Sequence, residues 1–270
     1  MKKRIAILLI FVLTLLPVAA LTSCGQKSDL NTVRSSGKLV IGVTVYDGMD
    51  YIKDGEEWVG FDADLAKLFA EELGVTPVFQ LIVWKNKVTE LKSGNIDLIW
   101  NGMTVTEELA ADIDFSLSYA ENRQVVIARR SNASAFPDVA SLKNAKVACE
   151  AGSAGEKVAK ETIGAATVNA LANGQVSALL EVTSGQSDVA VVDYTLAASV
   201  VGKGDYADLV LLDTAVFSFN KEEFAVGLRQ GSDLKALLDD FLRARFADGT
   251  MARLNETYGS PVVVSAETLG

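Results

Sequence analysis

The sequence predicts an α/β protein built from two similar units, each a mostly parallel sheet flanked by helices. From Lys38 onward, short apolar runs rich in β-branched residues alternate with amphipathic stretches, which is typical of parallel strands covered by helices. The same alternation restarts after Arg130. Two further extended segments, residues 124–128 and 224–228, separate the units. If both segments cross between the units, the chain passes from the first unit into the second and then returns.

The first unit has the order strand, helix, strand, helix, strand. Expected strands are residues 39–43, 78–83 and 96–100, and expected helices are residues 61–73 and a short one around Val88 and Leu91. Asp62 is available to cap the first helix, and Gly74 ends it. In such open sheets, ligands bind beyond the carboxyl ends of the strands.

The second unit repeats this plan. Its expected strands are residues 146–149, 188–192 and 209–212, and its expected helices are residues 154–162, 176–181 and 195–201. Two amphipathic helices near the C-terminus, around residues 234–242 and 251–258, are expected to pack back on the first unit. The predicted division is therefore residues 38–125 and 224–270 for the first unit, and residues 126–223 for the second.

The N-terminus has the pattern of a secretory signal. Three basic residues, Lys2, Lys3 and Arg4, precede an apolar run, Ile5–Ala20, that is too short to span a bilayer and ends in small residues. Leu21–Cys24 resembles the lipobox of bacterial lipoproteins, in which the cysteine thiol receives a lipid. We expect residues 1–23 to be removed, Cys24 to be lipidated, and residues 24–37 to tether an exported protein to the outer face of the cytoplasmic membrane. The alternative is a plain signal peptide followed by an unrelated cysteine.

Composition argues against several classes of function. The formal net charge of −10 over 270 residues opposes binding to nucleic acid or anionic lipid. The absence of histidine removes His-dependent nucleophile activation and the usual zinc ligand. If Cys24 is lipidated, Cys149 has no disulfide partner, and its apolar strand predicts a buried thiol. The sequence has no phosphate-cradling glycine loop and no Cys/His cluster, so we expect neither a cofactor nor a metal.

Several motifs together resemble a known family. They are Gly60-Phe61-Asp62-Ala63-Asp64-Leu65-Ala66, then the stretch from Leu91 to Thr106 with its Ser-Gly-Asn-Ile-Asp and Asn-Gly-Met-Thr segments, then Asp114-Phe115-Ser116, Gly152-Ser153, Asp193-Tyr194 and Gly231-Ser232. In order and spacing, these resemble the polar-amino-acid family of solute-binding proteins, which deliver ligands to ABC importers. The resemblance covers nearly the whole chain after the signal.

The resemblance implies a two-lobed clamp of the periplasmic-binding-protein type, with two crossing hinge strands. Such a clamp closes on a small amino-acid-like or amine ligand and presents it to the membrane subunits of an importer. It implies a monomeric binding protein rather than an enzyme. Carried over by position, the twelve ligand-binding positions are Tyr46, Asp50, Tyr51, Trp84, Trp100, Asn101, Gly102, Thr104, Leu109, Glu150, Ser153 and Asp193. Asp193 typically receives the α-ammonium of the ligand in a charge-assisted hydrogen bond.

One position departs from the family pattern. Members usually carry an arginine five residues after Thr104 that clamps the α-carboxylate of the ligand, and this chain has Leu109 there. The hydroxyl residue usual after Ser153 is Ala154. A desolvated carboxylate without a partner is costly, so we expect plain α-amino acids to bind poorly unless another cation substitutes. The remaining carboxylates and aromatic rings favour a cationic ligand, or one without a free α-carboxylate.

Several of these residues have alternative roles. Trp84 and Trp100 could pack in the core, Glu150 could be a solvated loop residue, and Asp50 could support a turn around Gly48. Two alternative functions also remain open. One is a dehydratase or lyase on the same scaffold, for which only Glu150 or Asp193 could supply the acid or base. The other is a ligand sensor that acts through a separate membrane receptor.

Overall fold

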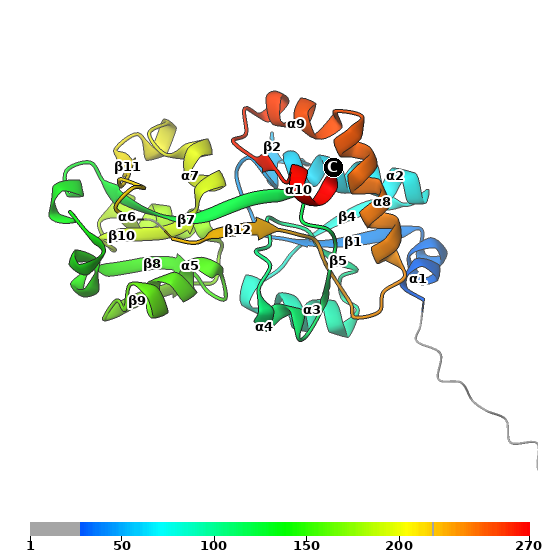
Figure 1. Ribbon diagram of the computed structural model, residues 1–270, viewed down its shortest axis with the longest axis horizontal. Coiled ribbons are helices and arrows are strands. Elements are labelled where there is room, and N and C mark those ends of the chain that lie inside the picture. The colour runs from blue at the N-terminus through cyan, green and yellow to red at the C-terminus, as the bar shows by residue number, and fades with distance from the viewer. Residues whose placement is uncertain (1–27, 218) are drawn as a thin grey trace, which may run out of the picture.

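The computed structural model describes residues 28–217 and 219–270, which form two lobes joined by extended strands (Figure 1). The predicted signal peptide, residues 1–23, and the predicted lipidation residue Cys24 lie outside the described residues. No helix in the described part of the chain is long and apolar enough to cross a membrane. The two-lobed α/β architecture predicted from the sequence is confirmed.

Lobe 1 is built on a five-stranded sheet in the order β4-β1-β5-β13-β6. These strands are β1 (Lys38–Val43), β4 (Thr76–Leu81), β5 (Leu98–Ile99), β6 (Asp114–Phe115) and β13 (Gly227–Leu228). Strand β1 pairs in parallel with β4 and β5, whereas β13 is antiparallel to its neighbours. The helices of this lobe include α2 (Phe61–Leu73), α3 (Lys87–Ser93), α8 (Leu234–Ala247), α9 (Thr250–Tyr258) and α10 (Ala266–Leu269). The C-terminal helices pack on lobe 1 as predicted, with α9 against α2.

Lobe 2 is built on a sheet in the order β11-β7-β10-β8-β9. Its own strands are β8 (Lys146–Glu150), β9 (Thr167–Leu171), β10 (Val189–Asp193) and β11 (Leu209–Leu211). Its helices include α5 (Ala154–Lys157) with the π-helical turn η4 (Val158–Thr162), α6 (Gln175–Ser184) and α7 (Tyr194–Val200). Strand β8 pairs in parallel with β9 and β10, so Glu150 and Asp193 end neighbouring parallel strands at one edge of the sheet.

Three strands meet between the lobes. Strand β7 (Ala120–Arg129) pairs with β12 (Lys221–Phe224) and β14 (Val263–Val264) near its start, and with β10 and β11 towards its end. The second crossing was predicted at residues 224–228, but the strand that crosses is β12. Gly227 and Leu228 instead form β13 in the lobe 1 sheet. Strand β12 is mostly charged, whereas residues 224–228 are apolar, so hydropathy favoured the segment that follows the crossing over the crossing itself.

The predicted tether is partly helical. Residues 29–36 form helix α1 (Asp29–Ser36), capped by Ser28 and ended by Gly37. The helix is fixed to lobe 1 because Asp29 pairs with Arg229 (Nε–Oδ1 2.8 Å) and the Leu30 amide donates to Asp233. The prediction of a tether over residues 24–37 is therefore wrong for residues 29–36. Their polar composition did not indicate a helix, because Val33 is the one residue of α1 that is buried.

The remaining elements are short. They are β2 (Tyr51–Lys53) and β3 (Glu57–Val59), which form a hairpin, α4 (Glu107–Ala110), and the 3-10 turns η1 (Trp84–Asn86), η2 (Ala133–Ala135), η3 (Val139–Asn144) and η5 (Gly204–Tyr206). Gly60 leads into α2 with φ 129°, and a Cβ there would stand 2.2 Å from the Met49 carbonyl oxygen, so only glycine fits. This close approach fixes the 46–50 loop against the start of α2.

Candidate functional site between the lobes

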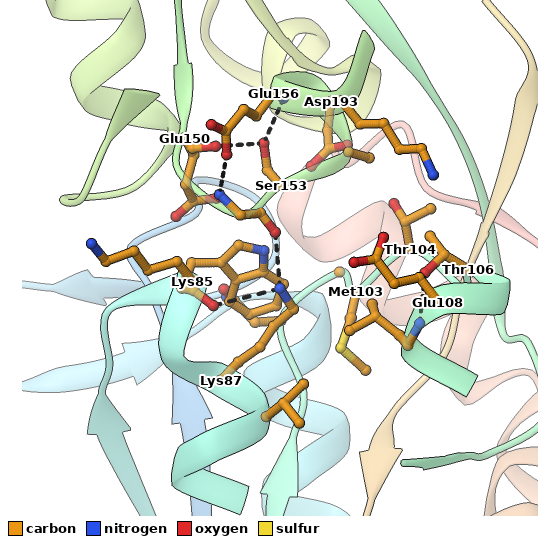
Figure 2. A pocket seen from close by; sticks show the side chains of 18 of the residues that line it. Lys85, Lys87, Met103, Thr104, Thr106, Glu108, Glu150, Ser153, Glu156 and Asp193 are labelled. Carbon is orange, nitrogen blue, oxygen red and sulfur yellow. Dashed lines mark hydrogen bonds between the residues drawn. The ribbon is translucent and has the colours of Figure 1, made fainter. Parts of the chain in front are cut away.

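A cavity of about 430 Å³ opens between the two lobes (Figure 2). Lobe 1 contributes η1, the start of α3, the loop after β5 and helix α4, and lobe 2 contributes the ends of β8 and β10 with the start of α5. The volume lies in the range of pockets that enclose small organic ligands, and such pockets favour the interfaces between domains. The carboxyl ends of strands therefore converge here, as expected for an α/β ligand site.

Eight of the twelve predicted site residues line this cavity. They are Trp84, Asn101, Gly102, Thr104, Leu109, Glu150, Ser153 and Asp193. Leu109 also packs beside Trp84 and Met103 in an apolar cluster of lobe 1. The position at which the family resemblance expects an arginine is thus part of an apolar wall.

The other four predicted residues do not line it. Trp100 is fully buried, with its ring against Phe69 and Tyr119, so the core alternative is the correct one. Tyr51 belongs to the β2–β3 hairpin and packs edge-on against Tyr258. Successive side chains of a strand point to opposite faces, so a residue at a strand end can face either the cavity or the core. The sequence did not show which way Trp100 faces.

Tyr46 and Asp50 lie behind the cavity. The Tyr46 hydroxyl is hydrogen-bonded to Thr195 Oγ1 of lobe 2, so this ring joins the lobes. Asp50 is fully buried and accepts a hydrogen bond from Asn101 Nδ2 (2.7 Å), which holds Asn101 from below. These two residues support the site rather than line it.

Most hydrogen-bond donors predicted for the ligand are already used within the protein. The Asn101 amide is bonded to Thr44 and Asp50, and the Gly102 N–H donates to Asp62 Oδ2 (2.7 Å). The Ser153 hydroxyl caps α5, donating to the Glu150 carbonyl (2.8 Å) and accepting from the Glu156 N–H (3.1 Å). These donors are consequently poor partners for an anionic ligand group.

Asp62, expected to cap α2, is instead fully buried beneath the site. Its Oδ2 accepts from the Gly102 N–H and from the Tyr119 hydroxyl, each at 2.7 Å. Burial raises the pKa of this carboxyl to about 7, although its hydrogen bonds act in the opposite direction. Asp62 therefore positions the loop that forms the lobe 1 side of the cavity.

Asp193 is the acidic residue of the cavity whose side chain is held in place by neighbouring amide groups. It is nearly buried, and its Oδ1 accepts hydrogen bonds from Asn122 Nδ2 and Gln124 Nε2, both at 2.6 Å. Gln175 Nε2 donates to its Oδ2. Its partners here are neutral amides. Burial raises the pKa of this carboxyl while the amides lower it, so a cationic ligand group would find a positioned acceptor.

A second carboxyl beside Asp193 was missed by sequence reasoning. Glu222 of β12 accepts from Gln124 (2.9 Å), Thr104 (3.1 Å) and Asn122 (3.2 Å) through Oε2. Burial and the charge of Asp193 raise the pKa of Glu222 to about 7. The sequence held no signal for this role, because Glu222 follows no motif and stands between two other charged residues.

Glu150 is a buried carboxyl with an unused oxygen. Its side chain is 2% exposed, and its Oε1 has no hydrogen-bond partner among the described residues. Burial, reinforced by the charge of Asp193, raises the pKa of Glu150 to about 8, although the charge of Lys87 and the Thr44 hydroxyl lower it. The solvated-loop alternative is therefore wrong.

Lys87 is the cation that sequence reasoning missed. It is 5% exposed, lines the cavity, and its Nζ lies 4.7 Å from the centroid of the Trp84 ring. The Nζ donates to the Gly152 carbonyl of lobe 2 at 2.9 Å (Figure 2). Burial lowers the pKa of Lys87 to about 8, and the charges of Glu150 and Glu108 raise it. A lysine at the start of a polar helix is typical of solvated surface, so nothing in the pattern distinguished it.

Cys149 lies one residue before Glu150 and is buried. Burial raises the pKa of its thiol to about 12, which leaves it protonated and unreactive. The predicted buried thiol is confirmed.

Comparison with known proteins gives a consistent result. The chain is 27% identical over 261 residues to the arginine-binding extracellular protein ArtP of Bacillus subtilis, covering 96% of this chain and 98% of that one. It is similar in structure to an amino acid ABC transporter substrate-binding protein from Streptococcus pneumoniae bound to L-arginine, with 28% identity, a TM-score of 0.78, and coverage of 88% and 100%. It is also similar to the ancestral amino acid-binding protein AncCDT-1, a precursor of cyclohexadienyl dehydratase, with 30% identity, a TM-score of 0.77, and coverage of 86% and 99%.

A family model matches residues 39–261, which includes both lobes and the crossing strands. That model describes the bacterial extracellular solute-binding proteins, family 3. The chain belongs to the bacterial extracellular solute-binding proteins, family 3.

Proposed function

We propose that the protein is the ligand-capturing component of an ABC importer and that its ligand is a small cation, an amine or an amino acid that carries net positive charge. The observation that carries this proposal is the uncommitted Oε1 of Glu150, buried at the cavity beside Asp193. A buried carboxyl without a partner costs free energy, and a cationic ligand group would remove that cost. The relatives named for arginine are consistent with such a ligand.

The balance of buried charge supports the same proposal. Among the described cavity residues that are buried, Glu150 and Asp193 are acidic and Lys87 is basic. The other cavity lysines, Lys85, Lys157 and Lys160, are exposed, and Lys160 pairs with Glu156. Two buried carboxyls beside one buried lysine favour a ligand cation, because the cation stabilises the charged form of both carboxyls in a weakly screened site.

We further propose that the mature chain is lipid-anchored through Cys24 on the outer face of the cytoplasmic membrane and acts as a monomer. The support is the lipobox-like Leu21–Cys24 at the end of the apolar N-terminal run. Helix α1 begins close behind it and is fixed to lobe 1 by Asp29 and Arg229, so the anchor would hold the protein through lobe 1. Metabolic labelling with a fatty acid tests this, and a Cys24→Ala variant should lose the label and be released from the membrane.

Titration calorimetry with a panel of small molecules tests the ligand proposal. The panel pairs L-arginine, L-lysine, agmatine and cadaverine with L-glutamate and L-glutamine. The proposal requires at least one of the four cations to bind more tightly than both L-glutamate and L-glutamine. Tight binding of L-glutamate or L-glutamine with no response to any cation would overturn it.

A second function has one specific observation in its favour. The pKa of Glu150, about 8, suits a general acid at neutral pH, and the scaffold is similar to an ancestor of a dehydratase. A binding role is still the better supported, because the residues around Asp193 hold it with amide donors that do not transfer protons. Incubation of the protein with each bound ligand, followed by mass spectrometry, separates the two: a binding protein returns its ligand unchanged.

A further inference from the structure

We propose that Lys87 is the specificity-determining residue that binds the carboxylate of the ligand, in place of the arginine that Leu109 does not provide. The inference rests on the proposed capture of a cationic ligand, and it narrows that ligand to one with a carboxylate in addition to its cationic groups. A dibasic amino acid has this combination, whereas a simple diamine does not.

The Lys87 ammonium is positioned to bind a ligand oxygen. Lys87 lies at the start of α3, and its Nζ is held at the cavity between the Trp84 ring of lobe 1 and the Gly152 carbonyl of lobe 2. A lysine ammonium has three N–H donors. One is used by Gly152 at 2.9 Å, and a second makes only a long contact of 3.5 Å with the Trp84 carbonyl. The third has no acceptor within the described residues, so a ligand oxygen can take it.

The other described residues named for this part of the cavity offer a ligand carboxylate no free side-chain donor that is better than Lys87. Leu109 is apolar, and the Asn101 amide and the Gly102 N–H are bonded to Asp50 and Asp62. On the lobe 2 side, the Ser153 hydroxyl is committed to the cap of its own helix. A ligand carboxylate must be paired when it is desolvated, and the buried Lys87 is the cation positioned to pair with it.

The ionisable groups of the cavity match the charges of a dibasic amino acid. Glu150 and Glu108 are the acidic groups that act on Lys87 through charge, and Glu150 has its own unused oxygen. The cavity thus holds one buried ammonium and two buried carboxyls, Glu150 and Asp193, a set that is complementary to a ligand with one carboxylate and two cationic groups. The same ligand therefore satisfies both acidic residues and the lysine, which an amine without a carboxylate cannot do.

Lys87 also joins the lobes through Gly152, so loss of the side chain could weaken closure for every ligand. The two roles are separated by ligand pairs that differ only in the carboxylate: L-arginine against agmatine, and L-lysine against cadaverine. A closure role changes both affinities in a pair by the same factor. A carboxylate role changes the ratio within the pair.

The experiment measures all four dissociation constants by calorimetry for the native protein, Lys87→Met and Lys92→Met. Lys92 lies on the same helix but is exposed and pairs with Asp112, so it serves as the matched control. We expect the native protein to prefer the amino acid of at least one pair, and Lys87→Met to reduce that preference by about 10- to 100-fold, the range of a hydrogen bond to a charged group. The control should keep the native ratio.

Each outcome bears on the inference. If the native protein binds agmatine or cadaverine as tightly as the matching amino acid, the inference is overturned and the cationic-ligand proposal stands. This comparison needs no variant, so it holds even if Lys87→Met does not fold. An equal loss for both members of a pair in Lys87→Met also overturns it, in favour of a closure role. If none of the four cations binds the native protein, both proposals fail.

Discussion

Gly152 of lobe 2 lies directly against Lys85 of lobe 1, and a Cβ at Gly152 would stand 2.6 Å from Lys85 Cα. The glycine has φ 76°, a left-handed conformation that disfavours other residues. Its carbonyl accepts the Lys87 hydrogen bond at the same place. Close approach of the lobes on this side of the cavity thus depends on the absence of a single side chain.

Gly152→Ala should weaken ligand binding by about tenfold or more. The added methyl group collides with lobe 1 backbone when the lobes are closed, so it disfavours the closed form, which makes the most ligand contacts. Gly164→Ala is the matched control, because Gly164 has φ 66° and a Cβ added there would meet no other atom within 4 Å. Calorimetry on both variants measures the effect. An equal change in the two would mean that backbone strain, and not the lobe contact, is responsible.

Ligand binding should release protons near pH 7. Free Glu150, with a pKa of about 8, mostly holds its proton at that pH, and a bound cation favours the charged carboxylate. Because binding releases a proton, affinity should rise up to about pH 7 and level off near pH 8, where Lys87, whose pKa is also about 8, loses its own charge. Calorimetry in two buffers with different ionisation enthalpies counts the protons. Glu150→Gln should bind more weakly and release fewer, and an unchanged proton count in that variant would contradict the assignment.

The ligand-free protein should be more stable at pH 5.5 than at pH 8. The pKa of Asp62 is about 7 in the folded state against 3.8 for a free aspartate, so the folded state binds the proton more tightly. Its contribution to stability is complete below about pH 4 and is lost as pH rises through about 7. Thermal unfolding across this range tests it. In Asp62→Asn, which cannot ionise, the dependence should be flatter, and a slope as steep as the native one would exclude Asp62 as its source.

The two tryptophans should respond differently to substitution. Trp100→Ala removes a fully buried ring packed on Phe69 and Tyr119, and should cost about 3–5 kcal/mol of unfolding free energy. Trp84→Leu keeps an apolar side chain in its cluster but removes the ring beneath Lys87, so it should affect ligand affinity more than stability. Urea denaturation and calorimetry measure the two effects. A stable Trp100→Ala protein with impaired binding would reverse this assignment.

The sequence predicted the architecture well because periodicity reports burial. The run from Leu39 to Val43 and the spacing from Phe61 to Leu73 are dictated by the sheet and by the helix face that covers it. The location of Asp193 at the cavity was also predictable, since a carboxylate that follows an apolar strand lies where α/β ligands bind. These predictions depend only on local pattern.

The errors arise where a local pattern is compatible with two environments. Trp100 and Asp62 stand in family motifs, but whether a motif residue faces the ligand, caps a helix or supports the site from below depends on tertiary packing. Lys87 and Glu222 are charged residues in polar segments, and only the fold buries Lys87 and half-buries Glu222. A charge becomes a binding group through desolvation, and desolvation is a property of the whole molecule.

Asn122 and Gln124 lie on β7, the strand that passes from one lobe to the other, and each donates to both Asp193 and Glu222. A cation bound to Asp193 would therefore act on hydrogen bonds made by the strand that joins the lobes. Cation binding at Asp193 and the angle between the lobes would then be linked by one coupling free energy. Its value is the same whether it is measured as the effect of binding on closure or as the effect of closure on binding. Substitutions at these two amides should alter how strongly the ligand drives closure, even though neither side chain lines the cavity.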